Sequence, residues 1–576
     1  MLSRRKALRV LLPLAASCAV LLGAEAALRI RLGVPPPDRE WPELDSNYSD
    51  IREDFFRLRF DPASRRAVYA TNRRGAGRQE FLAVKPEGLV RIFVVGGSVA
   101  IGYVNEDVVR LREFLRKSVP GTAFEVIGCG MAGYDSYRDA LIQREILAYH
   151  PDAIVLMSGN NEYYSPERVD PRLYRLTRAL RKSWVFRLPL ERLRARRSPG
   201  PPTLPERLAN FEANLESMAR RAKARGVPMI FCTLPANIRD VPPMRSPPPG
   251  DPAYFDARAA LEEGDAVNAS RLLEPYVRAH PSEPFGHYLL GRSLDRMRLY
   301  ARAREQYLLA LDGDDPGERC SPARNAIIRR VAKENGMILA DLDDAFTASA
   351  EHRLPDGHQF ADAMHWRNEY YPFVSWTILR SIYDSARSGG SFLSPAGRWR
   401  WGWFEREKNG ILEPPIGAES LDEMGDEAIY KAMSCIVPTR GEFSEAALAM
   451  LDGEARRNPG RLDFLTRSYE NVHSAFARDG WPPTDQFQGA WGAISLHVGE
   501  VHRRRREYAE ALRFFGEARR QDPGADRPLL YEAATLFALG RVGEAGALLA
   551  RVSAGSRDLP EFAYWRSRIG GGRRGL

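Results

Sequence analysis

Three apolar runs in this sequence are each followed by residues that could take part in acyl transfer. Ser98 comes directly after a run that ends in two glycines, the segment 128–133 after the second run is rich in glycine, and the segment 158–162 after the third reads Ser-Gly-Asn-Asn-Glu. Acyl transfer needs a nucleophile, together with backbone and amide N–H groups that hold a developing oxyanion. The three segments are therefore one candidate site, although Gly-Gly-Ser after a strand is also an ordinary turn.

The general base for such a serine has to come from nine histidines. Six of them lie at a helix end or in repeat segments, namely His150, His280, His287, His473, His497 and His502. Of the other three, His365 follows Asp362 by three residues, so the carboxylate can orient the imidazole and the imidazole can deprotonate the serine. His352 has no such motif, and Asp356 precedes His358 at the wrong spacing. Taken alone, the Asp362–His365 pair is also what a surface loop contains.

The elements that must position these residues follow an alternating pattern of strands and helices. Short apolar strands that alternate with helices predict a parallel sheet with helices on both faces, and such a sheet carries its site outside the carboxyl ends of the strands. The predicted strands are 89–95, 123–127, 153–157, 228–234 and 337–342. The predicted helices are 106–117, 136–147, 204–225, 323–334 and 368–383.

Two other regions follow a 34-residue helix–turn–helix pattern of the tetratricopeptide type. Ala269 and Ala303 are 34 residues apart, and so are Ala511 and Ala545. The first region interrupts the α/β domain, and the second follows it. Because each region is short and would leave an apolar end uncovered, we expect the two to pack against each other beside the Ser98 cleft.

Together, the four motifs resemble the SGNH (GDSL-like) hydrolase superfamily over about residues 85–385. The matching blocks are Gly97-Ser98, Gly130, Gly159-Asn160-Asn161-Glu162 and Asp362-Ala363-Met364-His365. The chain departs from the usual blocks at Gly97, at Glu162 and at Gly128, where Asp, Asp and Asn are common. The resemblance implies a three-layer α/β sandwich. Combined with the amino-terminal segment and the repeats, it looks like a membrane-anchored bacterial branch of the superfamily.

The resemblance also implies a role for each site residue. Ser98 would be the nucleophile, His365 the general base and Asp362 its orienting carboxylate. The oxyanion hole would be formed by the backbone N–H groups of Ser98 and Gly130 and by the side-chain amide of Asn161. This mechanism needs no cofactor and no metal.

Two polar residues after the fourth predicted strand are candidate substrate contacts. Asn237 and Arg239 lie at the same edge of the sheet as the triad. The alternative is a capped loop held by an Arg–Asp pair. Cys129 lies beside the oxyanion glycine but has no adjacent base, so we interpret it as a small buried hydrophobic residue.

The amino terminus predicts export from the cytoplasm. A basic segment, which includes Arg4, Arg5 and Lys6, precedes an apolar stretch over 10–28 that is interrupted only by Pro13 and Glu25. Nineteen helical residues span about 28 Å, close to the thickness of a bilayer core. We therefore expect a single-pass anchor in a bacterial cytoplasmic membrane, with the rest of the chain periplasmic. Cleavage at the Ala-Glu-Ala sequence 24–26 is the alternative.

Length and composition limit the remaining possibilities. A chain of 576 residues is too long for one hydrophobic core, and 44% hydrophobic with 28% charged residues exclude a disordered chain. The net charge of +9 is distributed over helices that also carry acidic residues, so we expect no nucleic-acid partner. The five cysteines include no Cys-x-x-Cys motif. Motifs for a phosphate loop, a zinc helix and a Gly-x-Ser-x-Gly elbow are also absent.

These observations predict an order of domains. It comprises an anchor at 1–30, an extended region at 31–88, a first hydrolase segment at 89–254, a helical insert at 255–316, a second hydrolase segment at 317–388, a linker at 389–415 and helical repeats at 416–576. The predicted function is a serine esterase or deacetylase for an O-acylated glycan or lipid, and the expected target is a cell-envelope glycan. An O-acyltransferase with the same triad and a non-catalytic repeat scaffold are the alternatives, and the repeats could bind a protein partner.

Overall fold

The computed structural model describes most of the chain. The described residues are 4–34, 54–104 without 64, 74 and 75, 109–162, 180–197 without 181, 203–244, 249–314, 317–387, 403–404, 429–478 in part, and 485–571 without 554, 555 and 558. Most of the predicted linker, 389–415, lies outside these residues. Trp403 and Phe404 are its described part, and Phe404 is buried against Trp376.

A five-stranded parallel sheet forms the centre of the α/β part, as predicted. Its strands lie in the order β5-β4-β6-β7-β8, and every adjacent pair is parallel. The bounds are β4 (Leu89–Gly96), β5 (Ala123–Gly130), β6 (Ala153–Met157), β7 (Met229–Cys232) and β8 (Ile338–Ala340). Because the chain leaves β4 for β5 on one side and continues with β6 on the other, the carboxyl end of β4 lies at the switch in strand order, where such sheets bind ligands.

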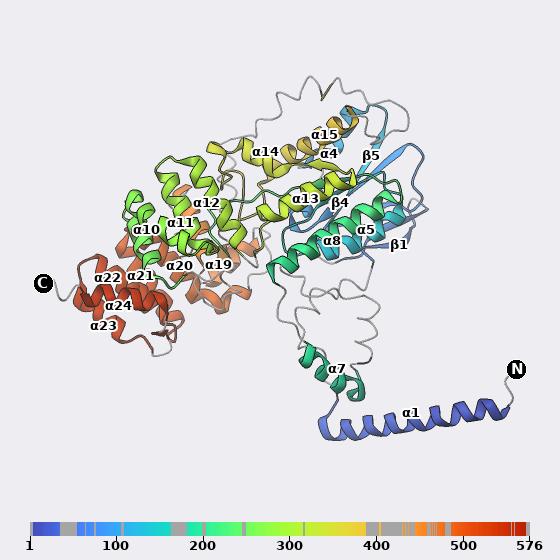
Figure 1. The fold of residues 1–576 in the computed structure, drawn as a ribbon, viewed down its shortest axis with the longest axis horizontal. Helices are drawn as coiled ribbons and strands as arrows, with labels where there is room; N and C mark the ends of the chain where they lie inside the picture. The colour runs from blue at the N-terminus through green and yellow to red at the C-terminus, as the bar shows by residue number, and fades with distance from the viewer. Residues whose placement is uncertain are drawn as a thin grey trace.

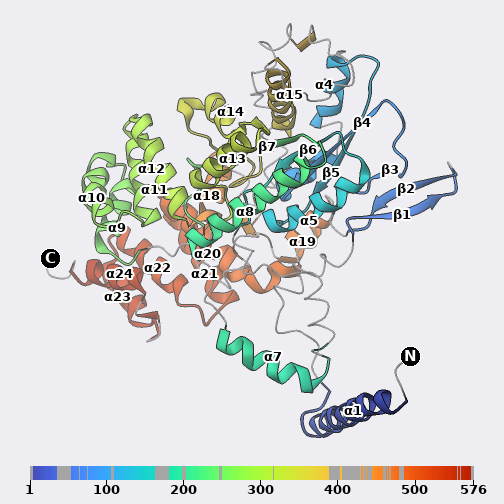
Figure 2. The same ribbon diagram turned by 45° about the vertical axis from the view of Figure 1, so that its right-hand side comes forward.

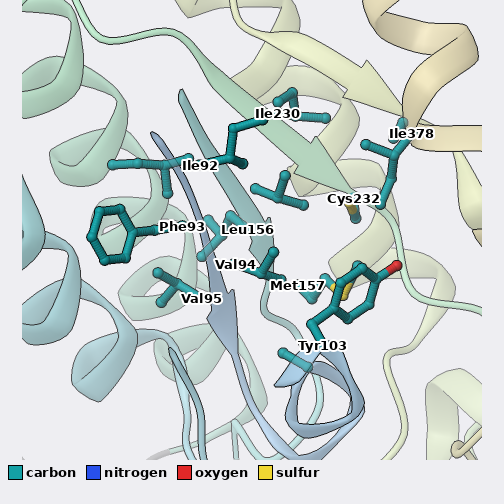
Figure 3. Close-up of a cluster of buried hydrophobic side chains, with 14 of the residues drawn as sticks. Ile92, Phe93, Val94, Val95, Tyr103, Leu156, Met157, Ile230, Cys232 and Ile378 are labelled. Atoms are coloured by element: carbon teal, nitrogen blue, oxygen red, sulfur yellow. The ribbon is translucent and has the colours of Figure 1, made fainter. Parts of the chain in front are cut away.

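Helices cover both faces of this sheet (Figure 1). One layer contains α5 (Ser136–Ile146), α8 (Leu204–Lys223) and α13 (Pro322–Asn335), in which α8 contacts the other two. The other layer contains α4 (Leu111–Ser118) and α15 (Tyr371–Arg387), which contact each other. Between the layers, apolar side chains of β4, β6 and β7 lie together with Tyr103 and with Ile378 of α15 (Figure 3). The core therefore holds the strand ends in fixed positions.

The segment predicted only as extended pieces forms a second, antiparallel sheet. It consists of β1 (Phe56–Asp61), β2 (Arg66–Thr71) and β3 (Glu80–Leu82), in that order. Phe56 and Phe81 pack edge-on against Phe93 of the central sheet. This sheet is therefore attached to the core of the central sheet by aromatic packing, a long-range contact that no local sequence pattern reports.

The predicted insert is present as two helix pairs between β7 and β8. They are α9 (Pro252–Glu262) with α10 (Ala266–Ala279), and α11 (Pro284–Arg296) with α12 (Tyr300–Gly313). Ala269 and Ala303, the two residues that indicated the repeat, are both fully buried. Gly291 must be small because a Cβ atom there would lie 2.7 Å from the ring of Tyr307.

The carboxyl-terminal region has the same construction. Its described helices are α18 (Glu445–Arg457), α19 (Tyr469–Arg478), α20 (Trp491–Arg504), α21 (Tyr508–Gln521), α22 (Arg527–Ala538), α23 (Val542–Ala550) and α24 (Pro560–Gly571). Gly499 must be small for the same reason as Gly291, because a Cβ atom at this position would lie 2.6 Å from the ring of Phe515. Ala511 and Ala545 are fully buried.

The two helical regions pack against each other, as expected (Figures 1 and 2). Phe255 of α9 stacks on Tyr564 of α24 with ring centroids 5.1 Å apart. Arg258 of α9 forms ion pairs with carboxylates of three carboxyl-terminal helices, Glu445 at 3.1 Å, Glu500 at 3.4 Å and Glu561 at 3.7 Å. The contact is therefore both aromatic and ionic.

The amino-terminal helix α1 (Arg4–Leu32) lies next to α7 (Trp184–Arg197) (Figures 1 and 2). The hydroxyl of Ser183 donates a hydrogen bond of 2.8 Å to the Glu25 carboxylate, and the Trp184 indole donates one of 2.8 Å to the Gly33 carbonyl. None of the helices in the described residues combines the length and the apolar character that a membrane span requires.

We predict that Arg258→Ala destabilises the contact between the helical regions. Glu500 is fully buried and loses one of its cations, so the free energy of unfolding should fall by about 3 kcal/mol. Chemical denaturation of the full chain measures this loss. The matched control is Arg302→Ala, which removes an exposed pair with Glu274 and should change stability by less than about 1 kcal/mol. Equal effects of the two substitutions would contradict an interface that depends on Arg258.

Candidate active site

Ser98 lies two residues beyond the end of β4, at the start of a short 3₁₀ helix, Ser98–Val104. The turn into this helix requires small residues. A Cβ atom on Gly96 would lie 2.3 Å from the carbonyl oxygen of Met157, and one on Gly97 would lie 2.9 Å from the side-chain nitrogen of Asn161. Because neither glycine has a side chain, the turn that carries Ser98 can lie against the carboxyl end of the neighbouring strand β6.

The predicted triad is assembled. The Nε2 atom of His365 is 2.6 Å from the Oγ atom of Ser98, and its Nδ1 atom is 2.6 Å from Oδ2 of Asp362. Nδ1 can therefore donate to the carboxylate while Nε2 accepts the serine proton, the arrangement that a general base needs. The His365 side chain is 30% exposed, against 11% for Asp362, so the imidazole is partly open to solvent while the carboxylate beside it is largely covered.

The loop that carries Asp362 and His365 is held by its own hydrogen bonds. Oδ1 of Asp362 accepts the backbone N–H groups of Met364 at 2.9 Å and His365 at 2.7 Å. The N–H of Ala361 donates to the carbonyl of His365 at 2.9 Å. One carboxylate oxygen of Asp362 therefore holds the loop in place, and the other orients the His365 imidazole.

The two predicted oxyanion residues lie at the neighbouring strand ends. Gly130 pairs with Gly96 across the β4–β5 ladder, and a Cβ atom at Gly130 would lie 2.4 Å from the backbone of Ala100. Asn161 has a left-handed backbone with φ 62°, and its amide donates to the carbonyl of Tyr134 at 3.3 Å. A glycine N–H and an asparagine amide therefore border the Ser98 turn, which are the donors that an oxyanion requires.

Glu162, one of the three residues at which the chain departs from the SGNH blocks, supports the segment after β6. One of its oxygens accepts the Ser136 N–H at 2.9 Å and the other accepts the Ser136 hydroxyl at 2.8 Å. Burial raises the pKa of Glu162 to about 8, and the nearby charge of Asp135 adds to the shift. The longer side chain thus links the end of β6 to the start of α5.

The other histidines of this region have different partners. His358 is 63% exposed, and its Nδ1 atom lies 3.0 Å from Asp356. His352 stacks on Tyr300 with ring centroids 3.6 Å apart.

Burial raises the pKa of the Cys129 thiol well above its usual value, which fits a small buried residue rather than a nucleophile.

The candidate substrate contacts both have protein partners. Asn237 donates from its backbone to the carbonyl of Ala363 at 3.0 Å, and its amide lies 3.4 Å from the carbonyl of Asp362. Arg239 binds Asp295 at 2.8 Å and Asp356 at 3.3 Å. The Arg–Asp alternative therefore describes Arg239, and Asn237 supports the catalytic loop. Contact of either residue with substrate stays a prediction.

Sequence reasoning missed one residue that organises the site. Arg324 of α13 is buried, and its guanidinium donates to the carbonyls of Gly159 at 3.2 Å, Gly317 at 3.2 Å and Arg319 at 2.9 Å. It therefore holds the turn before Asn161. An arginine near the start of an amphipathic helix gives no signal of this role, because its partners lie in distant segments.

Comparisons with known proteins give two results. A family model described as tetratricopeptide repeat matches residues 503–569. No curated protein matches this chain.

Solved structures that resemble it include an acetyl xylan esterase, AlAXEase, with 15% identity and a TM-score of 0.27, covering 51% of this chain and 100% of that one. A lipase/acylhydrolase from Enterococcus faecalis has 15% identity and a TM-score of 0.26, covering 51% and 96%. TesA has 12% identity and a TM-score of 0.25, covering 51% and 98%.

The triad geometry predicts the outcome of four substitutions. Ser98→Ala and His365→Ala should each abolish ester turnover, because one removes the nucleophile and the other removes the base. Asp362→Asn should lower kcat on the order of a thousandfold or more, since it no longer holds the required imidazole tautomer. His358→Ala is the matched control and should keep normal kcat. Steady-state kinetics with a chromogenic ester measure all four, and turnover by His365→Ala would assign the base to another residue.

Glu162 predicts a pH dependence of stability. Its pKa is raised in the folded state, so its contribution is complete below its unfolded pKa and is lost as the pH rises through about 8. Glu162→Gln keeps an acceptor for the Ser136 N–H and removes the charge. The Tm of this variant relative to the Tm of the parent should therefore increase as the pH rises from about 6 to about 9. Parallel curves for the two proteins over this interval would show that Glu162 does not titrate there.

Proposed function

We propose that this protein is a serine ester hydrolase that acts on O-acyl esters. The observation that carries the proposal is the aligned chain of two 2.6 Å contacts from Ser98 Oγ through the His365 imidazole to the Asp362 carboxylate. The placement of this chain at the carboxyl end of β4, beside Gly130 and Asn161, supports it.

The reaction follows from this geometry. Ser98 Oγ attacks the ester carbonyl carbon while His365 Nε2 takes the hydroxyl proton, and the negative charge develops on the carbonyl oxygen. The N–H groups of Ser98 and Gly130 and the amide of Asn161 would donate to that oxygen. When the C–O bond of the ester breaks, His365 returns the proton to the leaving alcohol. Water then attacks the acyl-Ser98 ester in the same way and releases the acid.

The proposed substrate is an O-acylated glycan of the cell envelope. The SGNH resemblance supports this class, and the His365 imidazole, which is 30% exposed, can be reached by a large substrate. The basic and apolar amino-terminal segment supports export, with the catalytic and repeat regions outside the cytoplasmic membrane. Fusion of a periplasm-dependent reporter enzyme after residue 576 tests this placement, and activity only in cytoplasmic reporters would contradict it.

The helical repeats support a second component of the proposal. Residues 503–569 match a tetratricopeptide repeat family, and two helical regions are packed together beside the hydrolase part. We propose that they hold the enzyme to a protein partner in the same envelope assembly.

The proposal predicts acyl release from a simple ester. The full chain should release acetate from p-nitrophenyl acetate, and Ser98→Ala should lower the rate to the background of the ester in buffer. Addition of neutral and acidic oligosaccharides separates the two enzyme classes. A hydrolase forms acetate alone, whereas an acyltransferase forms acetylated sugar as well, which mass spectrometry detects. Equal rates for Ser98→Ala and the parent would contradict a serine mechanism.

A further inference from the structure

A polar cavity of about 430 Å³ lies directly beside the catalytic loop. Three parts of the chain form it, which are the hydrolase segments 237–241 and 356–362, helix α11 of the insert and helix α18 of the carboxyl-terminal region. Asp362 belongs both to its lining and to the triad. A chain bound in this cavity would therefore lie beside the loop that carries the triad carboxylate.

A second cavity, of about 280 Å³, adjoins the first between the two helical regions. The two share five lining residues, Arg292, Arg296, Ala449, Asp452 and Arg456. Together they form one cleft, here called the junction cleft, that runs from the catalytic loop into the contact between insert and repeats.

Most charges in the first cavity are already matched. Arg239 is neutralised by Asp295 at 2.8 Å and Asp356 at 3.3 Å. Asp240 accepts the N–H of Gly357 at 2.8 Å. Asp362 binds His365, and the carboxylate of Asp452 pairs with Arg456 on the same helix. The acidic lining residues thus have local partners.

Two arginines of α11, Arg292 and Arg296, have other kinds of partner. A guanidinium nitrogen of Arg292 contacts the Tyr288 hydroxyl at 3.5 Å, and one of Arg296 donates to the carbonyl of Leu261. Among the residues that the structure describes, neither arginine forms an ion pair with a carboxylate. Both therefore place a positive charge in the wall that the two cavities share, and no carboxylate among the described residues is paired with that charge.

The arginines also act on each other. Burial lowers the pKa of Arg296, and the positive charges of Arg292 and Arg456 lower it further, although Tyr307 and Asp452 act in the opposite direction. Burial also acts to lower the pKa of Arg292, but Tyr288, Tyr307 and Asp240 raise it overall, so Arg292 keeps its charge. Like charges held together in a partly desolvated cleft raise the free energy of the empty site. A bound anion relieves this repulsion, and the planar guanidinium fork suits a carboxylate or a phosphate.

We propose that the junction cleft binds an anionic group, a carboxylate or a phosphate, of the acylated chain whose ester reaches Ser98. This assignment rests on the proposed function for the identity of the chain, but anion binding itself does not depend on turnover. The occupant is the acidic substrate chain, because the cleft is continuous with the catalytic loop through Asp362. The enzyme would thus select acidic over neutral glycans at a position remote from the ester.

The test measures binding by the full-length protein with isothermal titration calorimetry. The probes are oligogalacturonate for the carboxylate, inorganic phosphate for the phosphate, and a neutral xylo-oligosaccharide. At least one anion should bind more tightly than the neutral sugar, and Arg292→Gln should weaken it about tenfold or more, while Arg292→Lys retains part of the affinity. The two anionic probes distinguish the carboxylate from the phosphate.

Two further variants keep the test decisive. Arg292 also contacts Tyr288, so its variant could unfold, whereas Arg296→Gln alters a more exposed side chain and should weaken the same anion. Arg271→Gln is the matched control, since this exposed insert arginine contacts Asn268 outside the cleft and should leave anion binding unchanged. Binding of neither anion, or equal affinities of folded Arg292→Gln, folded Arg296→Gln and the parent, would overturn the assignment.

The outcomes separate the two proposals. Because calorimetry needs no turnover, loss of the junction cleft as an anion site leaves the Ser98-dependent release of acetate unaffected. Conversely, failure of Ser98→Ala to change the rate contradicts the serine mechanism even where anions bind at Arg292.

Discussion

The hydrogen bond between Ser98 and His365 joins positions 267 residues apart, and the rest of the structure serves to hold its 2.6 Å distance. Each of the two residues is held in position by its own turn and not by this hydrogen bond. The serine is held by the turn through Gly96, the last residue of β4, and Gly97, and the imidazole is held by the turn around the Asp362 carboxylate. The parallel sheet brings these two independently held segments together at the edge where its strands end.

The insert enters the chain between β7 and β8, so its packing reaches the same edge. Tyr288 of α11 donates to the carbonyl of Arg239 at 3.1 Å, and Arg239 binds Asp356 of the catalytic segment at 3.3 Å. Asn237, two residues before Arg239, contacts the backbone of Ala363. The helical insert is therefore connected to the triad through a short series of polar contacts, and a change in its packing can alter the His365 loop.

Local patterns in the sequence predicted the features that depend on local physics. The five apolar strands, the 34-residue repeats and the Asp362–His365 spacing were all visible, because periodicity and turn chemistry act over a few residues. Features that depend on distant partners were not visible. Nothing near Phe56 indicates its contact with Phe93, and nothing near Arg324 indicates that it holds the turn before Asn161.

The ionic contact between the two helical regions has a consequence for the junction cleft. Arg258, Arg503 and Arg504 face Glu262, Glu445 and Glu500 in a network that is largely buried. Such a network adds little net stability over an apolar contact, but an altered register would leave buried charges without partners at a high cost. It therefore fixes the orientation of α18, the helix that starts at Glu445. Because Asp452 and Arg456 lie on α18, the same charges that align the two helical regions also define the wall of the cleft.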